Sequence, residues 1–316
     1  MIGLNPSFSL IVETENLINA DIAGLSRSLA SLVNQTLSPE KAQEVLLLDS
    51  GDTPPQLLTQ LGDRYPWIKV HTVPDTASYY QAKMLGAEIA TGEIVVYCDS
   101  DCLYEATWLE NLLRPFSQNP DIAIVAGETM TRGVGIYGTA MVLAYIFPPF
   151  SQTTDLTPEK QYFLNNAAFR REFLLQHPIP TQLPLYRGNC AIHAANLPQN
   201  SIWRQPQARA THAPPASLSH FFWRFLLIGH DYYWQKQINR EKRVTATEPS
   251  GFGQKLQIFR ERLRDAIAWD FRHLIFLPFA LPIALTAALL VALGYFFTVA
   301  RPKTLLNTYQ NWLEQS

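Results

Sequence analysis

The sequence predicts an α/β fold with a mostly parallel central sheet and flanking helices, followed by a long apolar segment. Three observations lead to this prediction. Short apolar runs rich in β-branched residues alternate with helical patterns over residues 8–101. One of these runs ends in two aspartates, Asp99 and Asp101, and residues 274–300 contain no charged side chain. The 316 residues are enough for one domain with a full core and an appendage.

Each element follows from its local pattern. Apolar runs of four to six residues read as buried strands, and apolar residues spaced at helical intervals separate them. Strands that alternate with helices predict βαβ units and hence a parallel sheet. The predicted strands are Ser9–Val12, Val45–Asp49, Ile68–Val73 and Ile94–Cys98, and the predicted helices are 17–32, Gln56–Tyr65 and 78–91.

The carboxylates after the fourth predicted strand are the first candidate site. Ligands of open α/β sheets collect at the carboxyl ends of the strands. Asp99 and Asp101 lie at such an end, and two carboxylates there can hold a hard divalent cation. The alternative interpretation is a turn in which both side chains cap backbone N–H groups.

Six motifs, taken in order, resemble those of the inverting family 2 glycosyltransferases of the GT-A fold. The resemblance covers roughly residues 8–235. The matching segments are Ser9-Leu-Ile-Val-Glu-Thr-Glu-Asn16, Leu46-Leu-Leu-Asp49-Ser-Gly-Asp52, Ala82-Lys83-Met-Leu-Gly86 with Ala90-Thr-Gly92-Glu93, Asp99-Ser-Asp101, Asn165-Asn-Ala-Ala-Phe-Arg170-Arg171, and Pro206-Gln-Ala-Arg-Ala-Thr-His212.

This resemblance implies an enzyme that uses a nucleotide-diphosphate sugar and Mg2+ or Mn2+. Asp99 and Asp101 are expected to contact ribose and metal, with Asp101 the more direct ligand, and His212 is a candidate third ligand because imidazole suits Mn2+. The expected donor-binding residues are Thr14, Glu15, Asp49, Lys83, Asp99, Arg170 and Arg171. For Lys83 a solvated position on a helix is the alternative, and for His212 it is a hydrogen-bonded core histidine.

The catalytic base is where the sequence departs from the family pattern. The family carries Glu-Asp about a dozen residues before its Pro-x-Ala-x-x-x-His strand, and here that window contains Asn189. An amide cannot accept the proton of an attacking hydroxyl. We expect Glu128 or His193 to take over this role, Glu128 first, unless the acceptor is already anionic, as a lipid phosphate is.

Composition indicates a membrane enzyme in a reducing compartment. The net charge of −2 gives no sign of a nucleic-acid partner. The three cysteines are odd in number and form no Cys-x-x-Cys pair, so the sequence predicts neither a disulfide framework nor a zinc site. Residues 236–272 carry nine basic and five acidic side chains, which favours contact with anionic membrane lipids over a merely solvated helical face.

The run 274–300 exceeds the ~20 residues needed to cross a bilayer, whereas buried core helices are seldom so long. The predicted organisation is a GT-A domain over 1–240, a basic amphipathic linker over 241–272, a transmembrane segment over 273–300 and a tail over 301–316. Without a signal-peptide pattern at the N-terminus, the GT-A domain is expected on the cytosolic face, such as that of the bacterial inner membrane.

The functional hypothesis is therefore inverting sugar transfer from a nucleotide sugar to a lipid-linked or glycan acceptor at the membrane. Two alternatives stay open. One is a GT-A-fold protein that binds a nucleotide or a partner without catalysis, because Asn189 replaces the usual base. The other is a processive polysaccharide synthase, although a single apolar segment offers little from which to form a channel for the polymer.

Overall fold

The computed structural model describes residues 6–14, 22–51, 53–74, 76–241 and 252–313. By their internal contacts these residues form two compact units. The first unit comprises residues up to Thr129, Thr153–Thr181 and Leu197–His212, and the second comprises Met130–Gln152, Gln182–Asn196 and the chain from Ala213 onward. The second unit thus includes three segments that the sequence assigned to the predicted 1–240 domain, namely 130–152, 182–196 and 213–240.

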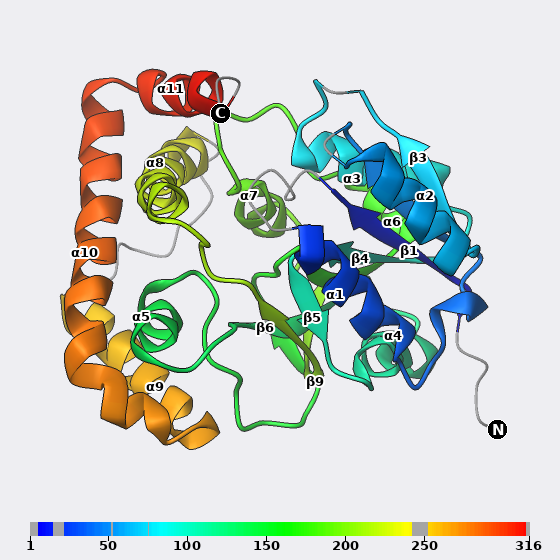
Figure 1. The fold of residues 1–316 in the computed structure, drawn as a ribbon, viewed down its shortest axis with the longest axis horizontal. Helices are drawn as coiled ribbons and strands as arrows, with labels where there is room; N and C mark the ends of the chain where they lie inside the picture. The colour runs from blue at the N-terminus through cyan, green and yellow to red at the C-terminus, as the bar shows by residue number, and fades with distance from the viewer. Residues whose placement is uncertain (1–5, 15–21, 52, 75, 242–251, 314–316) are drawn as a thin grey trace. The chain divides into compact units, whose positions relative to one another are not determined.

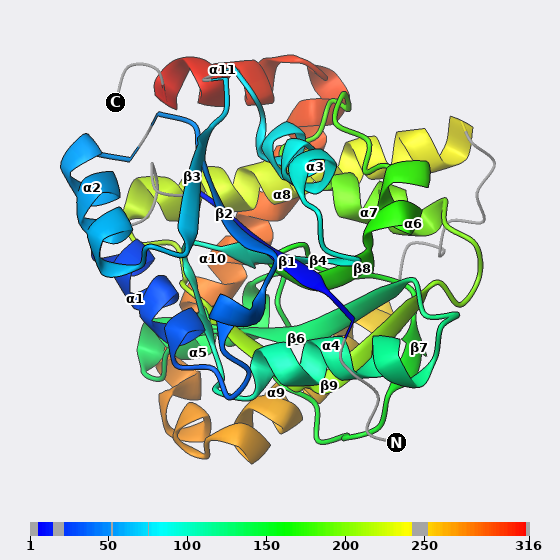
Figure 2. The same cartoon turned by 90° about the vertical axis from the view of Figure 1, so that its right-hand side faces the viewer.

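A nine-stranded mixed sheet forms the first unit, in the order β3-β2-β1-β4-β8-β6-β9-β5, with β7 paired to β9 (Figure 2). The predicted α/β class with flanking helices is confirmed. The strands are β1 (Phe8–Glu13), β2 (Glu44–Asp49), β3 (Ile68–Thr72), β4 (Ile94–Asp99), β5 (Cys102–Tyr104), β6 (Ile124–Thr131), β7 (Thr157–Glu159), β8 (Asn166–Arg170) and β9 (Ile202–His212).

Only one half of this sheet is parallel. Strands β3, β2, β1 and β4 pair in parallel, as the βαβ pattern predicts. Beyond β4 the pairs β4–β8, β6–β8, β5–β9 and β7–β9 are antiparallel. The later strands are short or interrupted by polar residues, which is why their apolar pattern did not predict this second half.

Helices cover both faces of the sheet. Side chains of α1 (Ile22–Val33) and α4 (Trp108–Gln118) join the core on the face of Leu10 and Val96. On the other face α3 (Tyr79–Ile89) packs so closely that a Cβ on Gly86 would meet the Ile11 side chain at 2.8 Å. Helices α2 (Pro55–Arg64) and α6 (Arg171–Gln176) complete this unit.

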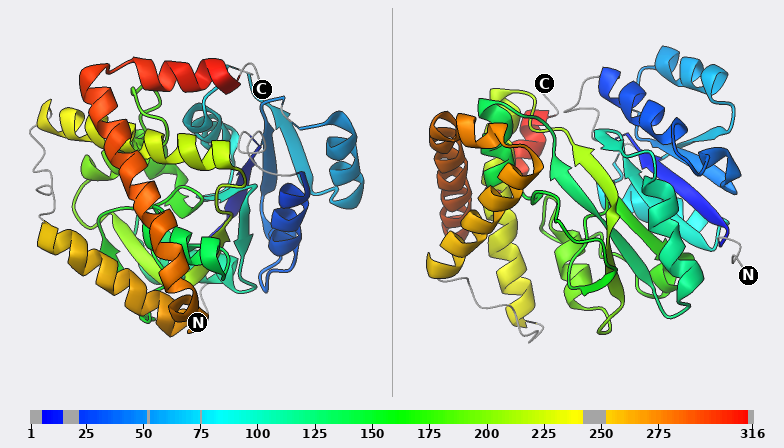
Figure 3. Two further views of the ribbon diagram at one scale, coloured as in Figure 1. Left: turned by 60° about the vertical axis from the view of Figure 1, so that its left-hand side comes forward. Right: turned by 90° about the horizontal axis from the view of Figure 1, so that it is seen from below.

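The second unit is helical. It consists of α5 (Ile136–Ala144), α7 (Asn189–Ala195), α8 (Leu218–Glu241), α9 (Phe252–Trp269), α10 (Arg272–Ala300) and α11 (Thr304–Leu313). Helix α10 packs on both α8 and α5. Figure 1 shows α8 and α5 end-on beside the long axis of α10, and Figure 3 shows α10 crossing α8.

Two glycines allow α10 and α8 to meet at backbone distance. A Cβ on Gly229 would lie 2.0 Å from the Val291 carbonyl oxygen, and a Cβ on Gly294 would lie 2.0 Å from the Leu226 carbonyl oxygen. Within the described residues, α10 is the one helix long and apolar enough to cross a membrane by length and composition. Because only 22% of its most apolar window is buried, α10 is not a core helix.

Candidate functional site

Acidic side chains mark the carboxyl ends of neighbouring parallel strands. The β1–β4 register sets Glu13 beside Asp99, and Asp49 ends β2 on the other side of β1. This edge is where open α/β sheets bind ligands. The parallel half of the sheet therefore brings together Asp49 and Asp99, two of the predicted donor-binding residues.

Asp99 is held by groups from α3. Lys83 Nζ lies 2.7 Å from Asp99 Oδ1, and Tyr79 donates its hydroxyl to both carboxylate oxygens at 3.1 and 3.0 Å. The Lys83 side chain is fully buried and also donates to the Cys98 carbonyl at 2.5 Å. Lys83 is thus not a solvated helix lysine, and its charge orients and neutralises Asp99.

The buried Tyr104 hydroxyl also holds the end of β4 in place. Tyr104 accepts a hydrogen bond from the Asp99 N–H at 2.8 Å and donates to the Asn165 carbonyl at 3.0 Å. Burial raises the pKa of Tyr104 well above its ordinary value, so its hydroxyl keeps the proton that it donates. Tyr79 and Tyr104 were missed in the sequence, because an aromatic residue beside a strand usually packs in the core.

Asp101, two residues after Asp99, forms a second cluster with His212. His212 Nε2 lies 3.1 Å from Asp101 Oδ2, because β5 and β9 pair with Cys102 opposite His212. One ligand atom each from Asp101, Cys102 and His212 lie within 4.8 Å of one another. The structure thus brings together two of the three predicted metal ligands, while Asp99 is turned toward Lys83 and lies outside this group.

Cys102 is the weaker member of this cluster. Burial, and then the neighbouring carboxylates, raise the pKa of its thiol well above the ordinary value. The thiol donates to Asp101 Oδ1 at 3.7 Å and accepts from Asn165 at 3.4 Å. Since only the thiolate is a good metal ligand, a carboxylate and an imidazole remain the favoured pair for a divalent cation.

The end of β2 carries a turn built on Asp49. Its Oδ1 atom accepts from the Thr14 hydroxyl at 3.1 Å and from the Thr53 N–H at 3.3 Å. Thr14 is fully buried, so it positions Asp49 through this bond. The predicted donor contact Glu15 lies outside the described residues.

Glu128 lies within β6 rather than just past a strand. Tyr97 and Ala126 are both paired with Ala167, so Glu128 is level with Asp99 on the same face of the sheet. Two strand spacings, about 10 Å, separate their backbones. The Glu128 carboxylate lies 3.9 Å from Arg204. The predicted position just past a strand is therefore corrected to one within β6, and Arg204 is the charged neighbour of Glu128 there.

Asn189 and His193 belong to the second unit, in α7. Both side chains are buried, and His193 follows Asn189 by one helical turn, as predicted. Asp231 of α8 positions the segment before α7 by accepting the backbone N–H groups of Tyr186 at 2.7 Å and Arg187 at 2.8 Å.

Arg170 and Arg171 lie at the wrong end of the sheet for donor binding. Arg170 is paired with Ile94 at the start of β4, five residues before Asp99. The guanidinium of Arg170 donates to the carbonyls of Phe116 and Ile122, and that of Arg171 donates to carbonyls of α3. The motif that contains them was found correctly, but its arginines tie elements together far from the strand-end carboxylates.

The fold and these strand-end carboxylates define the GT-A class, and comparisons with solved structures agree. A mannosyltransferase, PcManGT from Pyrobaculum calidifontis, in complex with GDP-Man and Mn2+, matches 98% of this chain and 85% of its own, with a TM-score of 0.53 and 20% identity. A crystal structure of GalNAc-T7 with UDP, GalNAc and Mn2+ matches 81% of this chain and 54% of its own, with a TM-score of 0.52 and 16% identity.

Residues 18–177, half of the chain, match the family model for glycosyl transferase family 2, so the chain belongs to this family. Among curated proteins it is similar to N-acetylgalactosaminyltransferase 6 of Drosophila melanogaster, with 29% identity over 110 residues, and to human polypeptide N-acetylgalactosaminyltransferase 10, with 27% over 117 residues. These matches cover 34% and 36% of this chain but only 16% and 19% of those proteins.

Proposed function

We propose that this protein is a metal-dependent glycosyltransferase that takes a sugar from a nucleotide-diphosphate donor and transfers it, with inversion, to a lipid-linked or glycan acceptor at a membrane. The observation that carries the proposal is the pair formed by Asp101 and His212, 3.1 Å apart beside a strand end lined by Asp49 and Asp99. A carboxylate oxygen and an imidazole nitrogen suit Mn2+ well, and Mg2+ less well because of the nitrogen.

The residues of this edge have distinct tasks in the proposal. Asp49 and Asp99 accept hydrogen bonds from the nucleoside, and Lys83 and Tyr79 keep Asp99 fixed for that contact. Asp101 and His212 would hold Mn2+, which when bound neutralises the charge of the departing diphosphate. The hydrogen bonds of Tyr104 to the Asp99 backbone and of Thr14 to Asp49 keep these carboxylates in place before the donor binds. Catalysis by charge stabilisation requires such preorganisation.

Glu128 is the proposed general base. It is level with Asp99 on the same sheet face, whereas Asn189 has no basic oxygen at the position of the family's usual aspartate. Arg204 lies 3.9 Å from the Glu128 carboxylate and can hold it in place. An acceptor that is already a phosphate anion needs no base, and His193 is the remaining side-chain candidate.

A matched set of variants tests the proposal. Asp101→Ala and His212→Ala should each lower Mn2+-dependent transfer at least about 100-fold, because a metal supplies several kcal/mol of charge stabilisation. Asp121→Ala removes an exposed carboxylate elsewhere and should leave transfer unchanged. Donor hydrolysis and transfer are measured with a panel of nucleotide sugars, with and without Mn2+.

The same set separates binding from turnover. Mn2+-dependent donor binding without any transfer or hydrolysis would favour the nucleotide-binding alternative, and wild-type rates in Asp101→Ala would refute the metal role. If Glu128 is the base, Glu128→Gln loses the acidic limb of the pH–rate profile while His193→Ala keeps it. If both variants keep that limb, a phosphate acceptor becomes the better explanation.

A further inference from the structure

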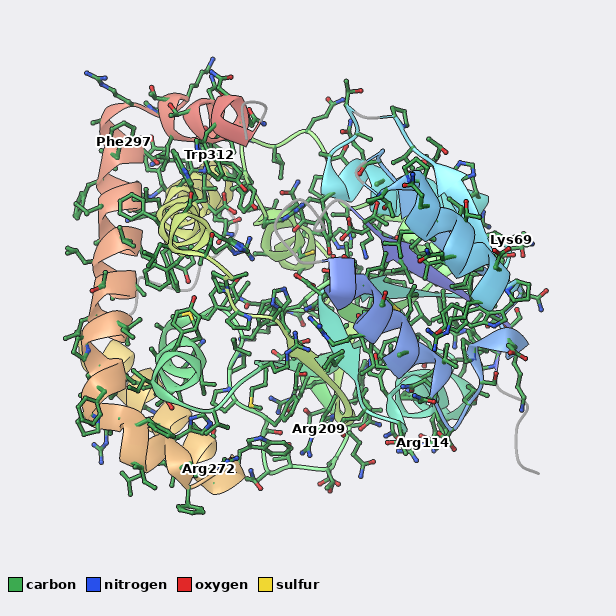
Figure 4. The ribbon with its side chains drawn as sticks, viewed as in Figure 1. Lys69, Arg114, Arg209, Arg272, Phe297 and Trp312 are labelled. Atoms are coloured by element: carbon green, nitrogen blue, oxygen red, sulfur yellow. The ribbon has the colours of Figure 1, made fainter. Side chains whose placement is uncertain are left out.

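Helix α10 has two faces of opposite character. The face toward α8 and α5 is buried and made mostly of small residues, namely Ala280, Ala284, Ala287, Leu290, Gly294 and Thr298. The outer face carries large apolar side chains that are 50–68% exposed, namely Leu274, Phe279, Leu285, Leu289, Leu293 and Phe296. Figure 4 shows side chains projecting from α10 on the side away from α8 and α5.

This outer face is too large for a water-exposed surface. The helix has 29 residues and is about 44 Å long, and its exposed apolar side chains from Leu274 to Phe296 extend over about 33 Å of that length. Monomeric soluble proteins rarely expose contiguous apolar patches of this extent, and such patches mark membrane or protein contacts. We propose that α10 lies in the plane of a lipid bilayer, with its outer face in the headgroup–acyl boundary and both of its ends on the same side, rather than crossing the membrane as a span.

Packing within the second unit argues against a crossing. The centre of α10 is near Thr286, and Gly294, where α8 crosses, is eight residues further on, or about 12 Å along the axis. A hydrocarbon core about 30 Å thick extends about 15 Å from its centre. A span would therefore place α8 inside the hydrocarbon.

Helix α8 is unsuited to that depth. It crosses α10, so a span would carry the crossing region of α8 into the hydrocarbon (Figure 3). It contains a buried His230–Asp231 pair and ends in exposed Arg240 and Glu241. Each ionised group in hydrocarbon costs roughly 3 kcal/mol on insertion scales. When α10 lies flat instead, α8 and α5 sit above it, on the water side.

Charge and aromatic residues at both ends of α10 fit a bilayer surface rather than a protein partner. The segment from α9 to Arg272 contains five basic and three acidic residues, and residues 301–316 contain two basic and one acidic. Anionic headgroups attract such segments. Trp269 and Phe271, 41% and 67% exposed at the corner before α10, are aromatic residues of the kind that sit at headgroup level.

Sidedness of the two helix ends tests the proposal directly. Single cysteines are introduced at the exposed positions Ala268 and Thr304, and a membrane-impermeant maleimide is applied to sealed membrane vesicles of one orientation. The native cysteines 98, 102 and 190 are buried and give little background. Both ends should label from the same side. Labelling of Ala268→Cys and Thr304→Cys from opposite sides would establish a span and overturn the proposal.

A second measurement tests the occupant of the outer face. The full chain is floated with vesicles of phosphatidylcholine with and without phosphatidylglycerol. Leu285→Glu, in the middle of the outer face, should weaken vesicle binding roughly tenfold or more, because burial of one leucine is worth that much. Asn307→Asp on α11 adds a negative charge at an exposed position away from the stripe and should bind much like wild type.

Dimerisation of the chain through the outer face of α10 is the outcome that would contradict lipid binding. A chain that forms stable dimers through α10 and ignores vesicles would show that the face is a protein interface, and the proposal fails. None of these measurements depends on sugar transfer. The location of α10 and the metal-binding role of Asp101 can therefore be refuted independently of each other.

Discussion

The two units differ in the feature that dominates their packing, although the second also buries the His230–Asp231 pair. In the first unit, charged and polar side chains lie inside: Lys83 and Asp99 are paired with almost no exposure, and Glu44 is enclosed by hydroxyl and amide donors. In the second unit, helices approach at glycines such as Gly229 and Gly294, and large apolar side chains lie outside. Under the two proposals above, the ordered charges serve the chemistry and the apolar exterior serves attachment to lipid.

This contrast predicts which kind of substitution lowers the stability of each unit. Removal of a charge should damage the sheet unit strongly. Added volume at the helix crossing should damage the helical unit, and the sheet unit should tolerate the same added methyl group at an open position.

The largest effect on stability is expected for Lys83→Met. Methionine fills a similar volume but leaves the Asp99 carboxylate buried without its cation, and breaking a buried ion pair costs about 3–5 kcal/mol. Chemical denaturation followed by tryptophan fluorescence measures the loss. The double variant Lys83→Met/Asp99→Asn removes both charges and should recover much of it. A single variant as stable as wild type would mean that the pair does not hold the strand end.

The parallel half of the sheet was predictable because its signals are local. The apolar runs at Ile94–Cys98 and Val45–Asp49 have the length of buried strands. Ser78 caps the N-terminus of α3, so this helix begins where it was expected. The pairing of Asp101 with His212 was also predicted, although only through the family resemblance. Nothing local links two residues so distant in sequence.

What the sequence could not provide were consequences of tertiary packing. The burial of Lys83 depends on how α3 lies on the sheet, and a lysine in a helix is ordinarily solvated. The strand register decides that Arg170 lies opposite Ile94, remote from Asp99. The hydropathy of α10 is equal for a span and a flat helix, and the proposal that it lies flat rests on its packing against α8.

An intermediate effect is expected for Gly294→Ala in the helical unit. The added Cβ would lie 2.0 Å from the Leu226 carbonyl oxygen, so α8 and α10 must separate, at a cost of about 1–3 kcal/mol. Gly62→Ala is the matched control, because it lies in α2 with no atom within 4 Å of the added Cβ, and alanine favours helices there. Thermal unfolding in detergent or vesicles should rank them in this order, and equal melting temperatures would contradict the close crossing.

The smallest effect concerns pH and Glu44 in the sheet unit. Burial tends to raise the pKa of Glu44, but hydrogen bonds from Ser9 and Thr91 outweigh it and hold the pKa below its ordinary value of 4.5. The folded state therefore binds the proton less tightly than the unfolded chain, so Glu44 contributes stability above pH 4.5 and loses it as the pH falls through the folded pKa. Glu44→Gln should cost roughly 1 kcal/mol at pH 7, since charge-assisted bonds are replaced by neutral ones. Denaturation at pH 7 and at a series of pH values below 4.5 measures the difference from wild type, which should shrink as the pH falls through the folded pKa. A difference that stays constant would mean that Glu44 acts through its shape alone, and the part given to buried charge in the sheet unit would lose one of its supports.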